Sequence, residues 1–184
     1  MPTGRPTVLI VDDEENITSL FEAWLTEEYD VRTANSGSEA LEEMSEAVDV
    51  ALLDRRMPTI SGDELLEEIR DRGYAVRVAM VTAIDPDFDV LEMGFDDYLT
   101  KPVSREDLEE IVEELLSRKS YDEDVQRYFS LASKKAALEE SKPMSELAAS
   151  EEYQTLLDEL DAVEAGLNDQ LSVEDDFIAA FRNL

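Results

Sequence analysis

The 184-residue chain contains neither cysteine nor histidine. The lack of cysteine excludes disulfide bonds, thiol chemistry and metal sites built on thiolates. The lack of histidine excludes a histidine general base and a phosphohistidine formed on this chain. Any chemistry carried by the chain must therefore use carboxylates, hydroxyls, lysine or arginine.

Basic residues are also scarce, since 16 Lys and Arg stand against 47 Asp and Glu, for a formal net charge of −31. A small domain usually carries a net charge of about 2–8 in magnitude. Self-repulsion of this size favours a salt-rich cytoplasm, in which counter-ions screen it. The alternative is a protein from a cytoplasm of ordinary salt concentration whose charge serves its solubility. The same charge disfavours strong binding to bare nucleic acid.

Salt is therefore expected to stabilise the fold. Between about 0.01 M and 1 M salt the Debye length falls from roughly 30 Å to 3 Å, so repulsion between surface carboxylates is screened. We expect the melting temperature to rise by about 10 °C or more, which corresponds to a few kcal/mol for a domain of this size. Thermal unfolding in KCl and in NaCl checks this, since screening predicts the same gain in both. Equal stability in dilute and molar salt would contradict it.

Long apolar runs are missing too. No stretch approaches the ~20 apolar residues of a membrane span, and residues 1–7 do not resemble a signal peptide. We therefore expect a soluble, cytoplasmic protein without a membrane partner. Hydrophobic residues nevertheless make up 43% of the chain, enough for a packed domain and a smaller element.

Residues 1–119 alternate between strand and helix patterns. Short apolar runs predict strands, and apolar residues at helical spacing, often after a capping serine, predict helices. The expected strands are 7–11, 30–34, 50–54, 76–81 and 97–100. The expected helices are 14–28, 36–45, 61–72, 87–93 and 104–116. This alternation predicts an α/β fold: a doubly wound, five-stranded parallel sheet of flavodoxin-like order 2-1-3-4-5.

Residues 120–184 contain no strand pattern. Two amphipathic helices are expected over about 122–140 and 145–171, separated by Ser141-Lys-Pro143, and they predict an antiparallel hairpin. Leu156, Leu160, Val163, Leu167 and Leu171 form a nearly heptad seam. Such a hairpin cannot bury both apolar stripes alone, so the seam predicts a homodimer or docking to another protein. Phe177, Ile178 and Phe181 indicate a short final helix or a tail.

Polar side chains follow four of the predicted strands. Asp12 and Asp13 follow the first, Asp54 the third, Thr82 ends the fourth and Lys101 follows the fifth. The carboxyl ends of parallel strands meet at one edge of a sheet. Three close carboxylates without histidine or cysteine favour Mg²⁺. A carboxylate nucleophile, a metal, a lysine and a hydroxyl together indicate phosphoryl transfer.

These residues resemble the receiver domain of two-component response regulators. The matching stretches are Val8-Leu-Ile-Val-Asp-Asp13, Leu53-Asp54 with Met57-Pro58 and Gly62, Val81-Thr82-Ala83, and Gly94-Phe-Asp-Asp-Tyr-Leu-Thr-Lys-Pro102. The resemblance covers about residues 5–119. It implies that Asp54 is phosphorylated by a partner histidine kinase. This fits a chain without histidine, which must receive its phosphoryl group from another protein.

The resemblance also implies roles for the neighbouring residues. Mg²⁺ would be bound by Asp12, Asp13, Asp54 and the backbone carbonyl of Arg56. Lys101 would pair with the phosphoryl oxygens, Thr82 would bond to one of them, and a cis peptide bond is favoured before Pro102. Tyr98 matches the switch aromatic whose ring moves inward, although simple packing is the alternative. Arg55 and Arg56 remain open between counter-ions for phosphate or donor and solvated surface residues.

Residues 120–184 resemble the HalX domain, a helical module attached to receivers in halophilic archaea. The combination implies a phosphorylation-controlled response regulator, a non-enzyme apart from its own phosphorylation and dephosphorylation. HalX would be the output or dimerisation module. A transcription regulator whose HalX domain contacts DNA is the alternative. A phosphatase of the haloacid-dehalogenase type would require Asp-x-Asp, whereas this chain has Asp54-Arg-Arg56.

Overall fold

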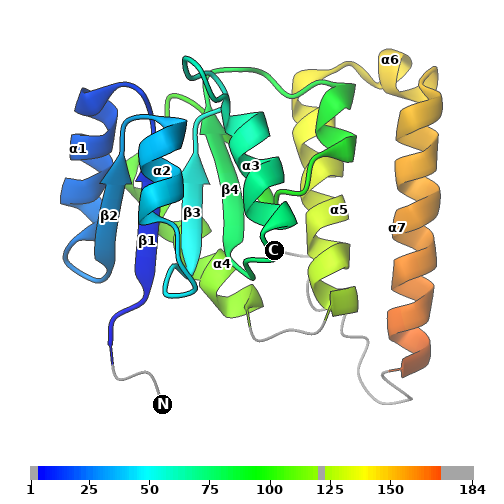
Figure 1. Ribbon diagram of the computed structural model, residues 1–184. Helices are drawn as coiled ribbons and strands as arrows, with labels where there is room; N and C mark the ends of the chain where they lie inside the picture. The colour runs from blue at the N-terminus through cyan, green and yellow to red at the C-terminus, as the bar shows by residue number, and fades with distance from the viewer. Residues whose placement is uncertain (1–3, 120–122, 171–184) are drawn as a thin grey trace. The chain divides into compact units, whose positions relative to one another are not determined.

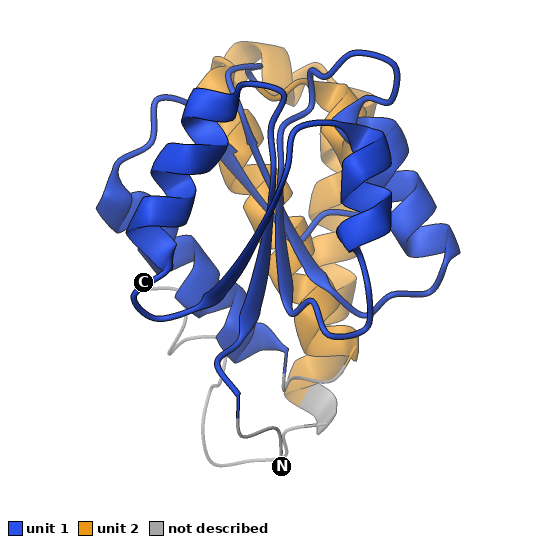
Figure 2. Cartoon of the chain, turned by 60° about the vertical axis from the view of Figure 1, so that its left-hand side comes forward, with its two compact units in different colours: residues 1–85, 92–120 blue, residues 86–91, 121–184 orange. Residues whose placement is uncertain are grey.

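The structure, a computed structural model, describes residues 4–119 and 123–170. The chain forms two compact units (Figure 2). The first comprises residues 1–85 and 92–120, and the second comprises residues 86–91 and 121–184. Within the described ranges no helix is long and apolar enough to cross a membrane.

The first unit contains a five-stranded parallel sheet in the order β2-β1-β3-β4-β5 (Figure 1), so the predicted topology is confirmed. Its strands are β1 (Thr7–Val11), β2 (Asp30–Ala34), β3 (Val50–Leu53), β4 (Arg77–Thr82) and β5 (Asp97–Thr100). Every residue of β3 is buried, and β1 and β4 are buried except at their first residue. Strands covered on both faces read as continuous apolar runs, which is why the sequence located them.

Helices cover both faces of this sheet. On one face, α1 (Glu15–Leu25) and α4 (Arg105–Arg118) bury their apolar sides in a core shared with β1, β3 and β4. The opposite face carries α2 (Gly37–Glu43) and α3 (Gly62–Asp71), seen in front of the sheet in Figure 1. This enclosed sheet gives the loops at its carboxyl edge a rigid support.

Side chains at the helix starts explain where these helices begin. Ser61 and Ser104 form reciprocal capping boxes with Glu64 and Asp107 at α3 and α4. Ser36 accepts a hydrogen bond from the Glu39 backbone, but the Glu39 carboxylate accepts from Asn35, one residue earlier than in a capping box. These bonds satisfy backbone N–H groups that have no partner within the helix.

The expected helix over 87–93 is wrong in type, because the structure has a 3-10 helix, η1 (Phe88–Glu92). The segment follows Pro86 and its apolar residues lack a clear helical period. A short 3-10 turn requires fewer aligned residues than an α-helix. Residues 86–91, called the crossover segment below, belong to the second unit.

The second unit is otherwise helical, with α5 (Glu123–Ser141), α6 (Met144–Ala148) and α7 (Glu151–Gln170). The expected helix over 145–171 is thus divided in two. Ser150 causes the division, because its hydroxyl oxygen accepts a hydrogen bond from the Tyr153 backbone and starts α7. α5 and α7 pack against each other, and Tyr153 donates a hydrogen bond to Glu139 at 2.6 Å.

The seam on α7 is covered in part by α5. Leu156 and Leu167 are buried, and Leu167 lies in a cluster with Val125, Tyr128 and Phe129 of α5. Leu160 and Val163 are only partly buried, so docking to another protein or dimerisation through this seam stays a prediction. Leu171 and the expected helix or tail over 175–184 lie outside the described residues.

Candidate functional site

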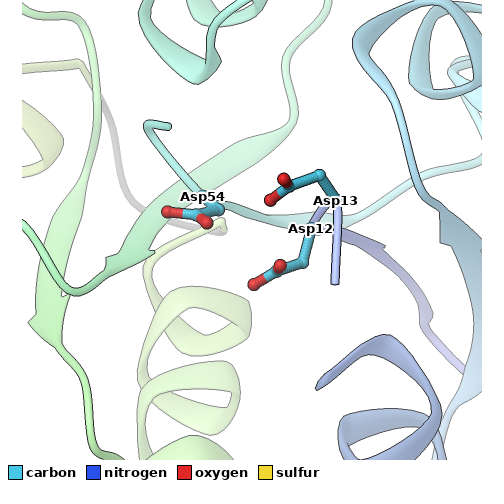
Figure 3. A group of neighbouring side chains, drawn as sticks. All are labelled: Asp12, Asp13 and Asp54. Atoms are coloured by element: carbon cyan, nitrogen blue, oxygen red, sulfur yellow. The ribbon is translucent and has the colours of Figure 1, made fainter. Parts of the chain in front are cut away.

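Three carboxylates converge at the carboxyl edge of the sheet. Asp12 and Asp13 follow β1, and Asp54 follows β3, which is paired with β1 in parallel. The register pairs Val11 with Leu53, so the next residue of each strand reaches the same level. An oxygen from each carboxylate lies within 4.8 Å of the other two (Figure 3). Asp12 and Asp54 are 2% and 6% exposed, whereas Asp13 is open to solvent.

Lys101 brings a positive charge to this cluster. Its Nζ lies 2.5 Å from Asp12 Oδ2 and 3.5 Å from Asp54 Oδ2. Burial raises the pKa of Asp12, with a smaller opposing effect from the hydrogen bond to Lys101. Burial also acts to lower the pKa of Lys101, but its bonds and attraction to Asp12 and Asp54 outweigh this and raise it. The lysine is therefore held protonated beside two buried carboxylates. The peptide bond between Lys101 and Pro102 is cis, as expected.

Two hydrogen bonds between uncharged groups link Thr82 to Tyr98 near the carboxylates. Thr82, at the end of β4, is fully buried, and its Oγ1 accepts a hydrogen bond from the Ile84 N–H at 3.3 Å. The Ile84 carbonyl accepts a hydrogen bond from the Tyr98 hydroxyl at 2.6 Å. Tyr98 is 8% exposed and its ring contacts Phe95, so the ring lies inward in this structure. The peptide groups of Ile84 thus join the threonine to the tyrosine.

An open pocket gives access to these groups. It is lined by Asp13, Asp54 and Thr82, together with Arg56, Met57 and the loop that follows β4. Arg56 is exposed, and its backbone N–H lies 3.4 Å from Asp54 Oδ1. A side chain on a second protein can therefore approach Asp54 through this opening.

Arg55 is placed differently from both sequence-based alternatives. It is 6% exposed, and its guanidinium donates two hydrogen bonds to Asp63 of α3, at 2.9 and 2.8 Å. It is thus neither a solvated surface residue nor directed to a phosphate, but fixes the loop after Asp54 to α3. No local pattern predicts this bidentate pair, because an acid nine residues after Asp54 has no special spacing.

Two further residues, to which the sequence analysis assigned no role, position the carboxylates. Asn35 donates hydrogen bonds to the Asp12 carbonyl and to Thr18 Oγ1, at 2.9 and 3.0 Å. Gly62 lies against the Asp54 backbone, and its N–H donates to the Arg55 carbonyl at 2.8 Å. Gly62 belongs to the stretches that carried the family resemblance, whereas no pattern singled out Asn35.

Removing the Lys101 charge is expected to destabilise the fold. In Lys101→Ala the buried Asp12 carboxylate loses its cation while Asp54 remains close, so we expect a loss of about 1–3 kcal/mol of unfolding free energy. Lys135→Ala is the matched control, because the ion pair of Lys135 among the described residues runs along its own helix to Glu139, an interaction worth about 0.3–0.5 kcal/mol. Urea unfolding of both variants in molar KCl measures the difference. An equal loss of unfolding free energy in the two variants would show that the Lys101–Asp12 pair stabilises the fold no more than a surface ion pair does.

Comparison with known proteins shows which families have sequences similar to this chain. Residues 8–113 match the family described as the response regulator receiver domain, and residues 117–181 match the HalX domain. A Haloferax volcanii protein named "Putative transcriptional regulator" is 49% identical over 88% of this chain and 28% of its own length. The Bacillus subtilis alkaline phosphatase synthesis transcriptional regulatory protein PhoP is 39% identical over 60% of this chain and 48% of that protein. The chain thus spans half or less of the length of these two relatives.

Solved structures agree with the fold. A CheY-like receiver domain protein from Methanospirillum hungatei has a TM-score of 0.59 and 31% identity, over 63% of this chain and 97% of that one. The Thermotoga maritima response regulator TrrA, solved in complex with Mg²⁺ and beryllium fluoride, has a TM-score of 0.54 and 35% identity. That similarity covers 60% of this chain and 99% of TrrA.

Proposed function

Because this chain belongs to the response regulator receiver family, we propose that Asp54 accepts a phosphoryl group from a histidine kinase. One observation supports this most directly: the buried Asp54 carboxylate lies beside Asp12, Asp13 and Lys101 at the mouth of an open pocket. In the transfer, the P–N bond of a phosphohistidine on the kinase breaks and a bond forms from an Asp54 oxygen to phosphorus. Hydrolysis of that acyl phosphate would return the carboxylate and release inorganic phosphate.

The three carboxylates fit a divalent metal. They offer oxygen ligands only, which suits Mg²⁺, and close like charges favour a cation among them. We propose that Asp12, Asp13, Asp54 and the Arg56 carbonyl hold Mg²⁺, which when bound supplies positive charge to the transferring phosphoryl oxygens.

The remaining residues then act on the phosphoryl group. Lys101 would keep its charge beside Asp12 and Asp54 and pair with a phosphoryl oxygen, a charge-assisted contact of the stronger kind. Thr82 would donate its hydroxyl to another phosphoryl oxygen. Its Oγ1 would have to move to reach that oxygen, and the bond that Oγ1 now accepts from the Ile84 N–H would be displaced in this exchange. Because Ile84 also accepts from Tyr98, this exchange would change the packing of Tyr98. We propose that the chain catalyses no reaction other than its own phosphorylation and dephosphorylation. We also propose that it acts in the cytoplasm, where a kinase can reach the pocket.

Intact-mass measurement tests the proposal. The full chain is incubated with acetyl phosphate and Mg²⁺ in molar KCl, and with EDTA in place of Mg²⁺. We expect one added phosphoryl group only when Mg²⁺ is present, located by peptide fragmentation at Asp54. A protein that stays folded and gains no mass in either condition would refute the proposal.

The helices after residue 119 are proposed as the output module. Their partner would be another signalling protein or a second copy of this chain, bound through the partly buried seam of α7. Phosphorylation would change the affinity for that partner, as expected when a ligand biases one of two conformations.

DNA binding by these helices is the second candidate, supported by the names of the Haloferax and Bacillus relatives. Three described bases of the module already meet acids: Arg127 meets Glu159, Lys135 meets Glu139, and Lys142 meets Asp87 and Glu146. Lys134 is buried. We therefore expect no binding when duplex DNA is titrated in high salt, with or without phosphorylation. Saturable binding by either form would instead favour the transcription regulator.

A further inference from the structure

The crossover segment is bound along its length by side chains of the helical module. The Ser141 hydroxyl, at the end of α5, donates a hydrogen bond to the Pro86 carbonyl at 3.0 Å. The next residue, Lys142, places its Nζ 3.0 Å from Asp87 Oδ1. The same Nζ lies 4.9 Å from the centre of the Phe88 ring, within the range of a cation–π interaction. Two adjacent residues of the module thus contact the first three residues of the segment.

The far end of the segment is bound by a buried lysine. Lys134 is 7% exposed, and its Nζ donates a hydrogen bond to the Leu91 carbonyl at 3.2 Å. Val90 beside it is fully buried. A buried ammonium is costly unless it is hydrogen-bonded, and the Leu91 carbonyl supplies one such bond. With contacts at both ends, the crossover segment should move together with α5.

Immediately before the crossover segment, the chain contacts Thr82 and Tyr98. Ile84, two residues before Pro86, donates its N–H to Thr82 and accepts the Tyr98 hydroxyl. Only Asp85 separates Ile84 from the segment that Ser141 and Lys142 hold. One residue is too short to absorb a displacement of Ile84 without moving Pro86, whose ring also restricts its own backbone and that of Asp85.

We propose that the crossover segment is the physical link between the phosphorylation site and the helical output module, with Ser141 and Lys142 as positioning residues. When Thr82 Oγ1 moves toward the phosphoryl group, the Ile84 N–H that donates to it is displaced, the segment shifts, and α5 follows it through these contacts. This rests on the proposed phosphorylation of Asp54. Linkage makes the effect reciprocal: weakening the hold on the segment must change the affinity of the pocket for a phosphoryl mimic.

Hydrogen exchange with beryllium fluoride and Mg²⁺ as the probe tests the link. In the wild-type chain, peptides from the pocket, from residues 86–91 and from residues 134–146 should all change exchange rate on addition of the probe. In the double variant Ser141→Ala, Lys142→Gln the pocket should still respond, while the change over 134–146 is lost. The probe's dissociation constant should differ from wild type by about fivefold, the low end of allosteric couplings.

Two controls isolate the contact with the segment. Lys135→Gln removes the same charge from α5, and Glu146→Gln removes only the second carboxylate near Lys142. Both should behave like wild type. A response of the pocket with no change over 86–91 or 134–146 in wild type would overturn the link, and so would a double variant that transmits normally.

A variant outside the module tests the link without any phosphoryl mimic. Tyr98→Phe removes the hydroxyl bond to Ile84 and retains the ring, so faster exchange over 86–91 and 134–142 is expected. Unchanged exchange there would refute the link. If the pocket failed to bind the probe, the phosphorylation proposal would fail, and this variant alone would still decide whether the segment transmits.

Discussion

Asp54→Asn is expected to abolish the phosphoryl adduct completely. The amide has nearly the shape of the carboxylate, but it lacks the negative oxygen that must form the bond to phosphorus. It also removes one of the three carboxylates proposed to hold Mg²⁺. The fold should persist, because an amide beside Asp12 and Lys101 reduces rather than increases like-charge repulsion. Intact mass after incubation with acetyl phosphate and Mg²⁺ in molar KCl measures the effect.

Asp85→Asn is the matched control for this experiment. Asp85 lines the same pocket and is exposed, but it lies outside the cluster of three carboxylates. Its adduct should match that of the wild-type chain. Retention of the adduct in Asp54→Asn would show that a different carboxylate accepts the phosphoryl group, and peptide fragmentation would identify it.

Gly62→Ala is expected to damage both the fold and the pocket. A Cβ at this position would lie 2.0 Å from the Asp54 carbonyl oxygen and 2.8 Å from the Arg55 Cα. These are backbone atoms of the loop that carries the proposed phosphoryl acceptor, so they cannot rotate away as a side chain would. Overpacking typically costs about 1–3 kcal/mol, and we expect the upper end or more. The corresponding fall in melting temperature is about 6–12 °C.

Gly166→Ala is the control, and we expect it to raise the melting temperature instead of lowering it. Gly166 lies within α7, and its added Cβ would meet no atom within 4 Å. Alanine is better than glycine in a helix by up to about 1 kcal/mol. Thermal unfolding in molar KCl should therefore separate the two variants clearly. Similar melting temperatures would contradict the close approach of α3 to the Asp54 loop.

Local patterns predicted the strands and most helices of the first unit. Buried apolar runs located β1 and β3, and serine caps located the starts of α3 and α4. The meeting of Asp12 with Asp54 follows from one topological rule, that parallel strands end at the same edge. This part could be predicted because each signal lies within a few residues of the element that it specifies.

The features that the sequence missed depend on distant contacts. Nothing near Arg55 indicates that it is buried against Asp63, and nothing near Phe88 indicates that residues more than fifty positions later hold it. The seam on α7 has the spacing of a dimer interface, but whether a second chain or α5 covers it depends on tertiary packing. Periodicity identifies an apolar stripe without identifying what covers it.

The second unit is discontinuous in sequence, because it includes residues 86–91 as well as those after residue 120. A chimera that joins its helices to another receiver at residue 120 would leave Lys134, Ser141 and Lys142 facing a foreign segment. Such a fusion could fold and accept phosphate and yet fail to signal. Grafting residues 86–91 together with the helices would transfer the whole unit, so the exchangeable part of this protein is defined by contacts and not by a single cut in the chain.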